Sequence, residues 1–167
     1  MKILWTPWRM EFIMGEKPEG CLFCTKKQEP EKKDRENYIL HRGATCYILL
    51  NLFPYTNGHM MIVPYQHVAS LEQLDDKSLY EMMALTRASV AALNKAISPA
   101  GFNIGLNLGK AAGAGIADHL HIHVVPRWAG DVNFLSVLGE TRLIPEALDD
   151  TYDKLLPVLT QEVSRIR

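Results

Sequence analysis

The chain of 167 residues contains little cysteine, no excess of charge of either sign and no long hydrophobic run. Its 3 cysteines are an odd number, which argues against a secreted disulfide framework and favours a reducing compartment. Its 18 basic residues are balanced by 19 acidic ones, so we expect no nucleic-acid partner. No stretch has the length of a transmembrane helix, and residues 1–9, with two tryptophans and a proline, are unlike a signal peptide. We therefore expect a cytoplasmic protein without a membrane partner.

The remaining composition is ordinary for a globular protein. Hydrophobic residues make up 47% and charged residues 22% of the chain, and its length suits one domain, residues 1–167, with a substantial core. Residues 15–37 differ from the rest, because they are rich in Lys, Glu, Pro and Gly and surround Cys21 and Cys24. We expect this region to be a loop organised locally by a metal ion.

The hydrophobic pattern predicts an α+β fold. Strand-like runs occur at 38–42, 46–52, 59–63 and 102–107. A helix is predicted at 76–97, capped by Asp75 or Asp76, and its inward apolar stripe comprises Leu79, Met82, Met83, Thr86, Val90, Leu93 and Ile97. A C-terminal helix should open at Pro145, with Pro157 kinking or dividing it. These elements indicate an antiparallel sheet with a long central helix and a C-terminal helix.

The most informative run places His119, His121 and His123 at a spacing of two. In an extended strand over 119–125, alternate side chains share a face, so the three rings would lie about 6.6 Å apart along one side. Three surface histidines on a polar strand face are the plain alternative, and a catalytic metal site of the kind seen in zinc hydrolases and cupins is another. Because a core position rarely requires three histidines in register, we favour a working site.

The residues before this run suit phosphate chemistry. The segment 109–118 is rich in small residues, and Gly113 and Gly115 allow backbone N–H groups to converge on an anion, although a glycine-rich hairpin turn is an equal alternative. A neutral imidazole near pH 7 can attack phosphorus and form a phosphoramidate that a second acceptor opens. The flanking histidines could bind phosphate oxygens, protonate the leaving group or orient the central ring. The pattern therefore favours phosphoryl or nucleotidyl transfer.

The pair Cys21 and Cys24 has the spacing of half a tetrahedral zinc site. A redox-active pair of the thioredoxin type would instead sit at a helix start after a core strand, which the polar surroundings disfavour. The third cysteine, Cys46, falls in a predicted strand, and we expect it to be buried.

At this point the sequence resembles the histidine triad superfamily, whose signature is His-x-His-x-His followed by two apolar residues. Residues 119–125 match it at every position, and 50–59 and 126–131 resemble the family's ribose-binding strand and its usual continuation. The Leu4–Arg9 segment, the cysteine pair and the Gly-Ala-Gly-Ile loop look like the bacterial diadenosine tetraphosphate phosphorylase-like branch. The resemblance covers the chain from Leu4 to about Tyr152.

The resemblance implies a homodimeric nucleotidyltransferase that converts diadenosine tetraphosphate and phosphate to ADP and ATP. It makes His121 the nucleophile and His123 a phosphate hydrogen-bond donor, with His119 as the first triad member. It places Asn51 at the ribose, Asn107 near the phosphates and His59 behind the triad, although Asn51 could simply end a strand and His59 could be a turn residue. A hydrolase or phosphoramidase, or a nucleotide-binding regulatory module with little turnover, are the alternatives.

The resemblance also completes the metal site. Zinc-containing relatives add two histidines to the cysteine pair, and the matching positions are His67 and His119, so Cys21, Cys24, His67 and His119 would hold a structural zinc. His119 could instead remain in the active site. The chain departs from the hydrolase branches at Gly115, where a phosphate-contacting glutamine is common. This departure puts hydrolase activity in doubt and is compatible with room for inorganic phosphate.

Overall fold

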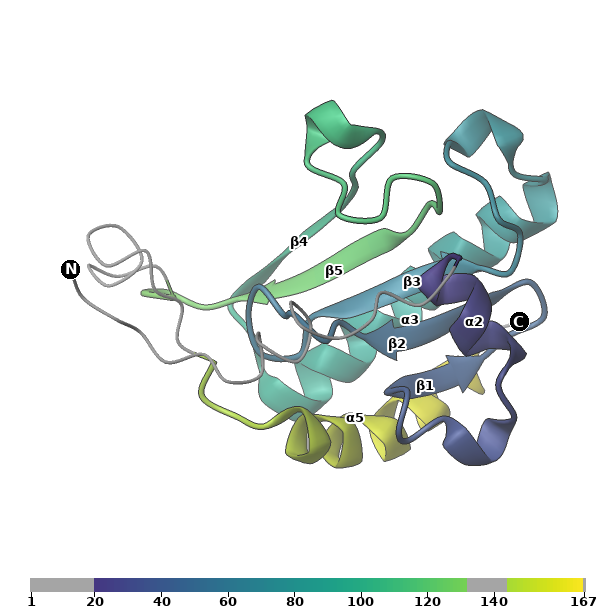
Figure 1. Ribbon diagram of the computed structural model, residues 1–167. Helices are drawn as coiled ribbons and strands as arrows, with labels where there is room; N and C mark the ends of the chain where they lie inside the picture. Colours follow the sequence, from purple (N-terminus) through teal and green to yellow (C-terminus); the bar gives the residue numbers. More distant parts are fainter. Residues whose placement is uncertain (1–19, 132–143, 167) are drawn as a thin grey trace.

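Five antiparallel strands form one sheet in the order β1-β2-β3-β5-β4 (Figure 1). The computed structural model describes residues 20–131 and 144–166. The strands are β1 (Ile39–Arg42), β2 (Cys46–Leu50), β3 (Met60–Pro64), β4 (Gly101–Leu106) and β5 (Ile122–Arg127). The predicted Leu4–Arg9 motif, with Trp5 and Trp8, and the start of the 15–37 region lie outside the described residues. Within the described part, the α+β architecture is confirmed.

Two helices cover one face of the sheet. Helix α3 (Asp76–Ile97) matches the predicted 76–97, and the Asp75 carboxylate caps it by accepting the backbone N–H of Ser78 at 2.7 Å. Helix α5 (Leu148–Val163) packs beside it and against β1 (Figure 1). Together with alternate residues of the strands they bury the larger core, which we call the helix-side core and which includes Ile48, Ile62, Leu85, Leu93, Ile122, Val124 and Leu155.

The opposite face carries a smaller core under a short helix, α2 (Leu22–Gln28). Phe23 of α2 packs with strand residues that alternate with those of the helix-side core, and the set, which we call the α2-side core, is Phe23, Ile39, Tyr47, Leu49, Met61 and Val63. Because β2 and β3 are covered on both faces, every residue in them is buried. Cys46 is fully buried in β2, as predicted.

The histidine strand is shorter than expected, because β5 begins at Ile122 rather than at 119. Its register with β3 would place Leu120 opposite Pro64, which has no N–H to continue the ladder. The N–H of Leu120 instead donates to the Val68 carbonyl at 2.7 Å, and Leu120 is buried in the helix-side core. His119 and His121 are therefore still directed away from the helix-side core.

Three other expectations need correction. The 15–37 region is not simply a loop, since it contains α2 and the 3-10 turn η1 (Glu31–Lys33). Met83 is 63% exposed and lies off the buried stripe of α3, whereas Met82 is in the core as predicted. Helix α5 starts at Leu148 rather than at Pro145 and runs through Pro157 without being divided. The flanking residues Leu155 and Leu159 are fully buried, so tertiary packing keeps the two halves together.

None of the helices in the described ranges is long and apolar enough to cross a membrane.

Candidate active site and metal cluster

His121 is held so that one ring nitrogen remains available. Its Nδ1–H donates to the backbone carbonyl of His119 at 2.9 Å. A carbonyl can only accept, so the neutral ring carries its proton on Nδ1 and its lone pair on Nε2. The His121 and His123 rings meet edge to face, with 4.7 Å between centroids. Burial lowers the pKa of His121, although the hydrogen bond to His119 raises it in opposition. The geometry leaves Nε2 as a nucleophilic atom.

A chain of hydrogen bonds determines the proton position on His123. The backbone N–H of Tyr55 donates to Nδ1 of His59 at 3.1 Å, so this nitrogen is unprotonated and His59 carries its proton on Nε2. That Nε2–H lies 3.0 Å from Nδ1 of His123 and donates to it. His123 consequently carries its own proton on Nε2. This nitrogen is a hydrogen-bond donor at the site, where a phosphate oxygen could accept it.

The two asparagines lie next to this chain. The side-chain nitrogen of Asn107 is 3.4 Å from Nε2 of His123. Both atoms are donors when His123 is protonated on Nε2, so the Asn107 amide would accept this proton only with its oxygen turned toward the ring. The Asn51 side chain accepts the N–H of Phe53 at 2.9 Å, and its amide nitrogen lies 3.3 Å from Nδ1 of His59. Burial, and secondarily the nearby His121, lower the pKa of His123 to about 4, so the ring is neutral at pH 7. The structure thus brings Asn51, His59, Asn107 and His123 together, while their roles toward substrate remain predictions.

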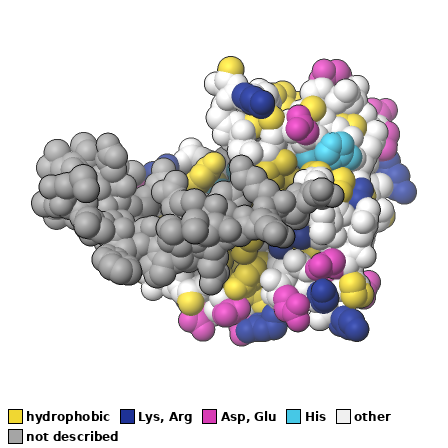
Figure 2. Space-filling view, viewed as in Figure 1, with side chains coloured by type: hydrophobic (Ala, Val, Ile, Leu, Met, Phe, Trp, Pro, Cys, Tyr) yellow, Lys and Arg dark blue, Asp and Glu magenta, His cyan; other side chains and the backbone are white. Residues whose placement is uncertain are grey.

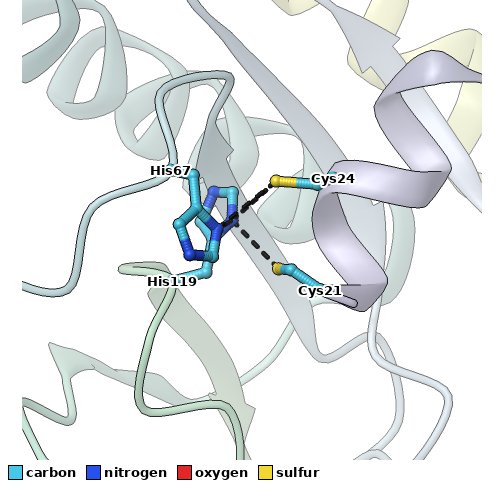
Figure 3. A group of neighbouring side chains, drawn as sticks. All are labelled: Cys21, Cys24, His67 and His119. Atoms are coloured by element: carbon cyan, nitrogen blue, oxygen red, sulfur yellow. Dashed lines mark hydrogen bonds between the residues drawn. The ribbon is translucent and has the colours of Figure 1, made fainter. Parts of the chain in front are cut away.

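The four predicted metal ligands also converge (Figure 3). Their ligand atoms all lie within 4.8 Å of one another, and we call Cys21, Cys24, His67 and His119 the Cys/His cluster. Nδ1 of His119 is 3.2 Å from the Cys21 sulfur, 3.6 Å from the Cys24 sulfur and 3.2 Å from Nδ1 of His67. The Cys24 sulfur is 3.4 Å from Nδ1 of His67. From the sequence, His119 could be either a zinc ligand or an active-site residue. The structure directs its side chain to the cluster rather than to His123.

The chemistry of this cluster fits a metal ion. The Nε2–H of His119 donates to the Pro64 carbonyl at 2.9 Å, which leaves a lone pair on Nδ1 inside the cluster. Tetrahedral zinc with bonds of about 2.0–2.3 Å separates its ligand atoms by about 3.3–3.8 Å, close to the spacings here. Burial and the neighbouring Cys21 raise the pKa of the Cys24 thiol, and a cation would reverse that effect. His67 is exposed, and histidine atoms reach the surface in Figure 2.

The glycine-rich connection lies apart from these contacts. It contains the 3-10 turn η3 (Lys110–Ala112) and projects beyond the ends of β4 and β5 in Figure 1. Gly113 has a φ of 84°, the left-handed conformation that favours glycine. Gly113 and Gly115 are both exposed, and a side chain at either would meet open space. Their predicted contact with phosphate stays a prediction.

Sequence reasoning missed two features of the site. Cys21 is the N-cap residue of α2, so the cysteine pair does lie at a helix start, although no core strand in the described residues precedes it. Phe23, between the two cysteines, contacts the rings of both His119 and His121. The position of Phe23 between the two cysteines indicated that it lies near the metal site, but no sequence pattern predicted its contact with the histidines.

Comparison with known proteins identifies related chains. A protein named AP-4-A phosphorylase from Mycobacterium tuberculosis is 42% identical over 154 residues, which cover 89% of this chain and 79% of that protein. Adenosine 5'-monophosphoramidase hnt1 from Schizosaccharomyces pombe is 30% identical over 108 residues, covering 65% of this chain and 74% of that protein.

The fold is also similar to that of a solved structure. A zinc-bound histidine triad family protein from Mycobacterium smegmatis superposes with a TM-score of 0.68 at 26% identity, over 87% of this chain and 96% of that one. The HIT domain family itself matches residues 32–130, from η1 past the end of β5. With a family match over more than half its length and a relative that shares its sequence along most of it, the chain belongs to the HIT (histidine triad) domain family.

Proposed function

We propose that this chain transfers a nucleotidyl group from a dinucleoside polyphosphate to inorganic phosphate, with His121 as the nucleophile. The observation that carries the proposal is the hydrogen bond from His121 Nδ1–H to the His119 carbonyl, which leaves Nε2 as a lone-pair nucleophile beside a donor on His123. The likeness to the M. tuberculosis phosphorylase makes the chain an enzyme of the histidine triad type. The same likeness supports a nucleotide as the substrate of this chain.

The reaction would proceed in two displacements. Nε2 of His121 attacks the α-phosphorus of diadenosine tetraphosphate, forming a P–N bond as the P–O bond to ATP breaks. The phosphorylated imidazole keeps its proton on Nδ1, and this N–H continues to donate a hydrogen bond to the His119 carbonyl. An oxygen of inorganic phosphate then attacks the same phosphorus, the P–N bond breaks and ADP leaves. His123 would donate from Nε2 to a non-bridging oxygen, where negative charge gathers in both transition states.

Water in place of phosphate would make the chain a hydrolase or phosphoramidase. The likeness to the S. pombe protein named a monophosphoramidase favours this second candidate, in which water would open the proposed nucleotidyl–His121 intermediate. Glycine at position 115, where the hydrolase branches commonly carry a phosphate-contacting glutamine, is compatible with phosphate as the acceptor.

We also propose that the Cys/His cluster binds zinc and that the chain acts as a homodimer. Two sulfurs and two imidazole nitrogens within 4.8 Å of one another support zinc, as does the zinc-bound M. smegmatis relative. When bound, zinc would supply a cross-link between α2 and the segment before β5, without entering the reaction. Dimerisation is the property implied by the family resemblance.

The deciding experiment is a product assay with diadenosine tetraphosphate, run with and without inorganic phosphate and resolved by ion-exchange chromatography. ADP and ATP that form only with phosphate would establish the phosphorylase. AMP-containing products in both conditions would establish the hydrolase instead, and no products would favour a phosphoramidase or a binding module.

The first variant to test is His121→Asn, which removes the nucleophile. We expect turnover to fall at least about a thousandfold, while nucleotide binding, measured by calorimetry, stays detectable. Lys32→Gln, an exposed change in η1, serves as the control and should keep full activity. Turnover that survives His121→Asn would rule out the covalent mechanism.

A further inference from the structure

Phe23 connects the Cys/His cluster to the nucleophile. It lies between Cys21 and Cys24 near the start of α2 and is 1% exposed. Its ring centroid is 5.4 Å from that of His119, in an edge arrangement, and 5.0 Å from that of His121. Phe23 therefore contacts a proposed metal ligand and the proposed nucleophile at once.

The backbone of α2 is held firmly enough for Phe23 to serve as a support. The hydroxyl of Tyr47 donates to the Phe23 carbonyl at 2.9 Å. The Arg42 guanidinium donates to the carbonyls of Lys27 and Glu29 at 3.0 and 3.1 Å, which satisfies the C-terminal end of the helix. At the start of the helix, the Cys21 sulfur lies 3.2 Å from Nδ1 of His119 and the Cys24 sulfur 3.4 Å from Nδ1 of His67. Both ends of this seven-residue helix are thus attached to the sheet or to the histidine segment.

The His121 ring needs more than one contact to keep its Nε2 aimed. A single hydrogen bond at Nδ1 leaves the plane of an imidazole free to tilt about the donor–acceptor line. Two further contacts come from the ring of His123, 4.7 Å away between centroids and nearly perpendicular, and from the ring of Phe23. Displacement of a reacting atom by about 1 Å can lower a rate about a hundredfold, so the orientation of this ring matters.

We propose that Phe23 is a positioning residue for His121, which holds the nucleophilic imidazole in its reactive orientation and links that orientation to the Cys/His cluster. This inference rests on the proposed role of His121 in nucleotidyl transfer. A phenyl ring has no atom that could attack phosphorus or donate a hydrogen bond to a phosphate oxygen, so Phe23 would act only through the His121 ring that it contacts. Its loss should therefore reduce the rate of the chemical step more than it reduces substrate binding.

The test compares Phe23→Leu with Leu49→Ala. Leucine keeps much of the volume of Phe23 but removes the ring, so the chain should still fold. Leu49 is also 1% exposed and belongs to the same α2-side core, but it lies on β2, which β3 separates from β5. Each variant is measured for its melting temperature, for kcat and KM with diadenosine tetraphosphate and phosphate, and for the His121 Nδ1–H signal in NMR spectra of histidine-labelled protein.

We expect Phe23→Leu to lower kcat about tenfold with KM within about twofold, and to broaden or shift the His121 Nδ1–H signal. Leu49→Ala should reduce the melting temperature at least as much but leave kcat and the signal near those of the unaltered chain. The proposal is overturned if Phe23→Leu leaves kcat and the signal unchanged, or if Leu49→Ala reduces kcat equally. If the unaltered chain turns over no dinucleotide, the proposed function fails, while the NMR signal still decides the role of Phe23.

Discussion

At the scale of single residues, one backbone N–H determines the hydrogen-bond roles of two histidines. The N–H of Tyr55 cannot accept, so it makes Nδ1 of His59 an acceptor, and the direction of donation follows along the chain to His123. His123 is thereby a neutral donor without carrying positive charge. His121 obtains the opposite arrangement, with its Nε2 unprotonated, from the His119 carbonyl. Two triad histidines with the same ordinary pKa are thus prepared for different tasks by their neighbours.

The buried, neutral His123 predicts a loss of stability in mild acid. Burial lowers its pKa from 6.5 to about 4 in the folded chain. Between these values the unfolded chain binds more protons than the folded chain, so stability decreases as the pH falls from 6.5 toward 4 and levels off below 4. We expect His123 to contribute about 2 kcal/mol of this loss at pH 4.5, because a pKa shift of one unit corresponds to about 1.4 kcal/mol. The loss is measured as the difference between the free energies of unfolding in urea at pH 7 and at pH 4.5.

Other histidines contribute to the same trend, so a variant is needed to isolate His123. His121 and His59 face its ring, and His121 has a pKa lowered by burial as well. His123→Asn should therefore reduce the difference in unfolding free energy between the two pH values without abolishing it. An unchanged difference would show that His123 takes up its proton equally well in the folded chain.

At the scale of elements, α2 is the part of the site that sequence periodicity could not predict. Seven residues are too few for a helix to be stable in isolation, and two of them are adjacent lysines. It forms because Arg42 satisfies its last carbonyls and Phe23 is buried in the α2-side core. By contrast, α3 was predictable to its ends, since 22 residues of periodic pattern and an Asp75 cap are local signals.

The Cys/His cluster predicts that metal removal destabilises the chain. We expect about one zinc per chain by elemental analysis, and Cys24→Ser should lower the zinc content severalfold. Removal of zinc by a chelator should reduce the free energy of unfolding by about 3 kcal/mol relative to the chain at a zinc concentration 100 times its Kd. Cys46→Ala is the matched control, because Cys46 is buried in β2 away from the cluster and should leave the zinc content intact. Equal zinc in Cys24→Ser and the unaltered chain would rule out the cluster as the binding site.

At the scale of the whole molecule, the two faces of the sheet have different tasks. The helix-side core contains most of the buried hydrophobic side chains and supports the sheet, while the opposite face holds the histidines beside the α2-side core. Of the two edges, β1 packs against α5, whereas β4 has three consecutive exposed residues, Asn103 to Gly105. An edge strand offers unpaired N–H and C=O groups to a second chain.

This edge is where we expect the predicted homodimer to form. Ile104 is 49% exposed on β4, so Ile104→Lys should place a charge in the interface and raise the dimer dissociation constant at least about tenfold. Sedimentation velocity over a range of protein concentrations measures the change. Gln161→Lys, on the exposed side of α5, adds the same charge and should have no effect. A monomeric unaltered chain, or a dimer insensitive to Ile104→Lys, would contradict this placement.

The sequence by itself determined the fold class, the family and the identity of most candidate site residues. Periodicity records which face of a helix or strand is buried, and the spacing of the triad and of the cysteine pair records chemistry that is local in the chain. The tertiary structure alone decided that His119 turns its side chain to the cluster, that β5 begins only at Ile122 and that Phe23 lies against His121. Each of these depends on residues distant in sequence, such as Pro64, Val68 and Cys21, whose positions no local pattern encodes.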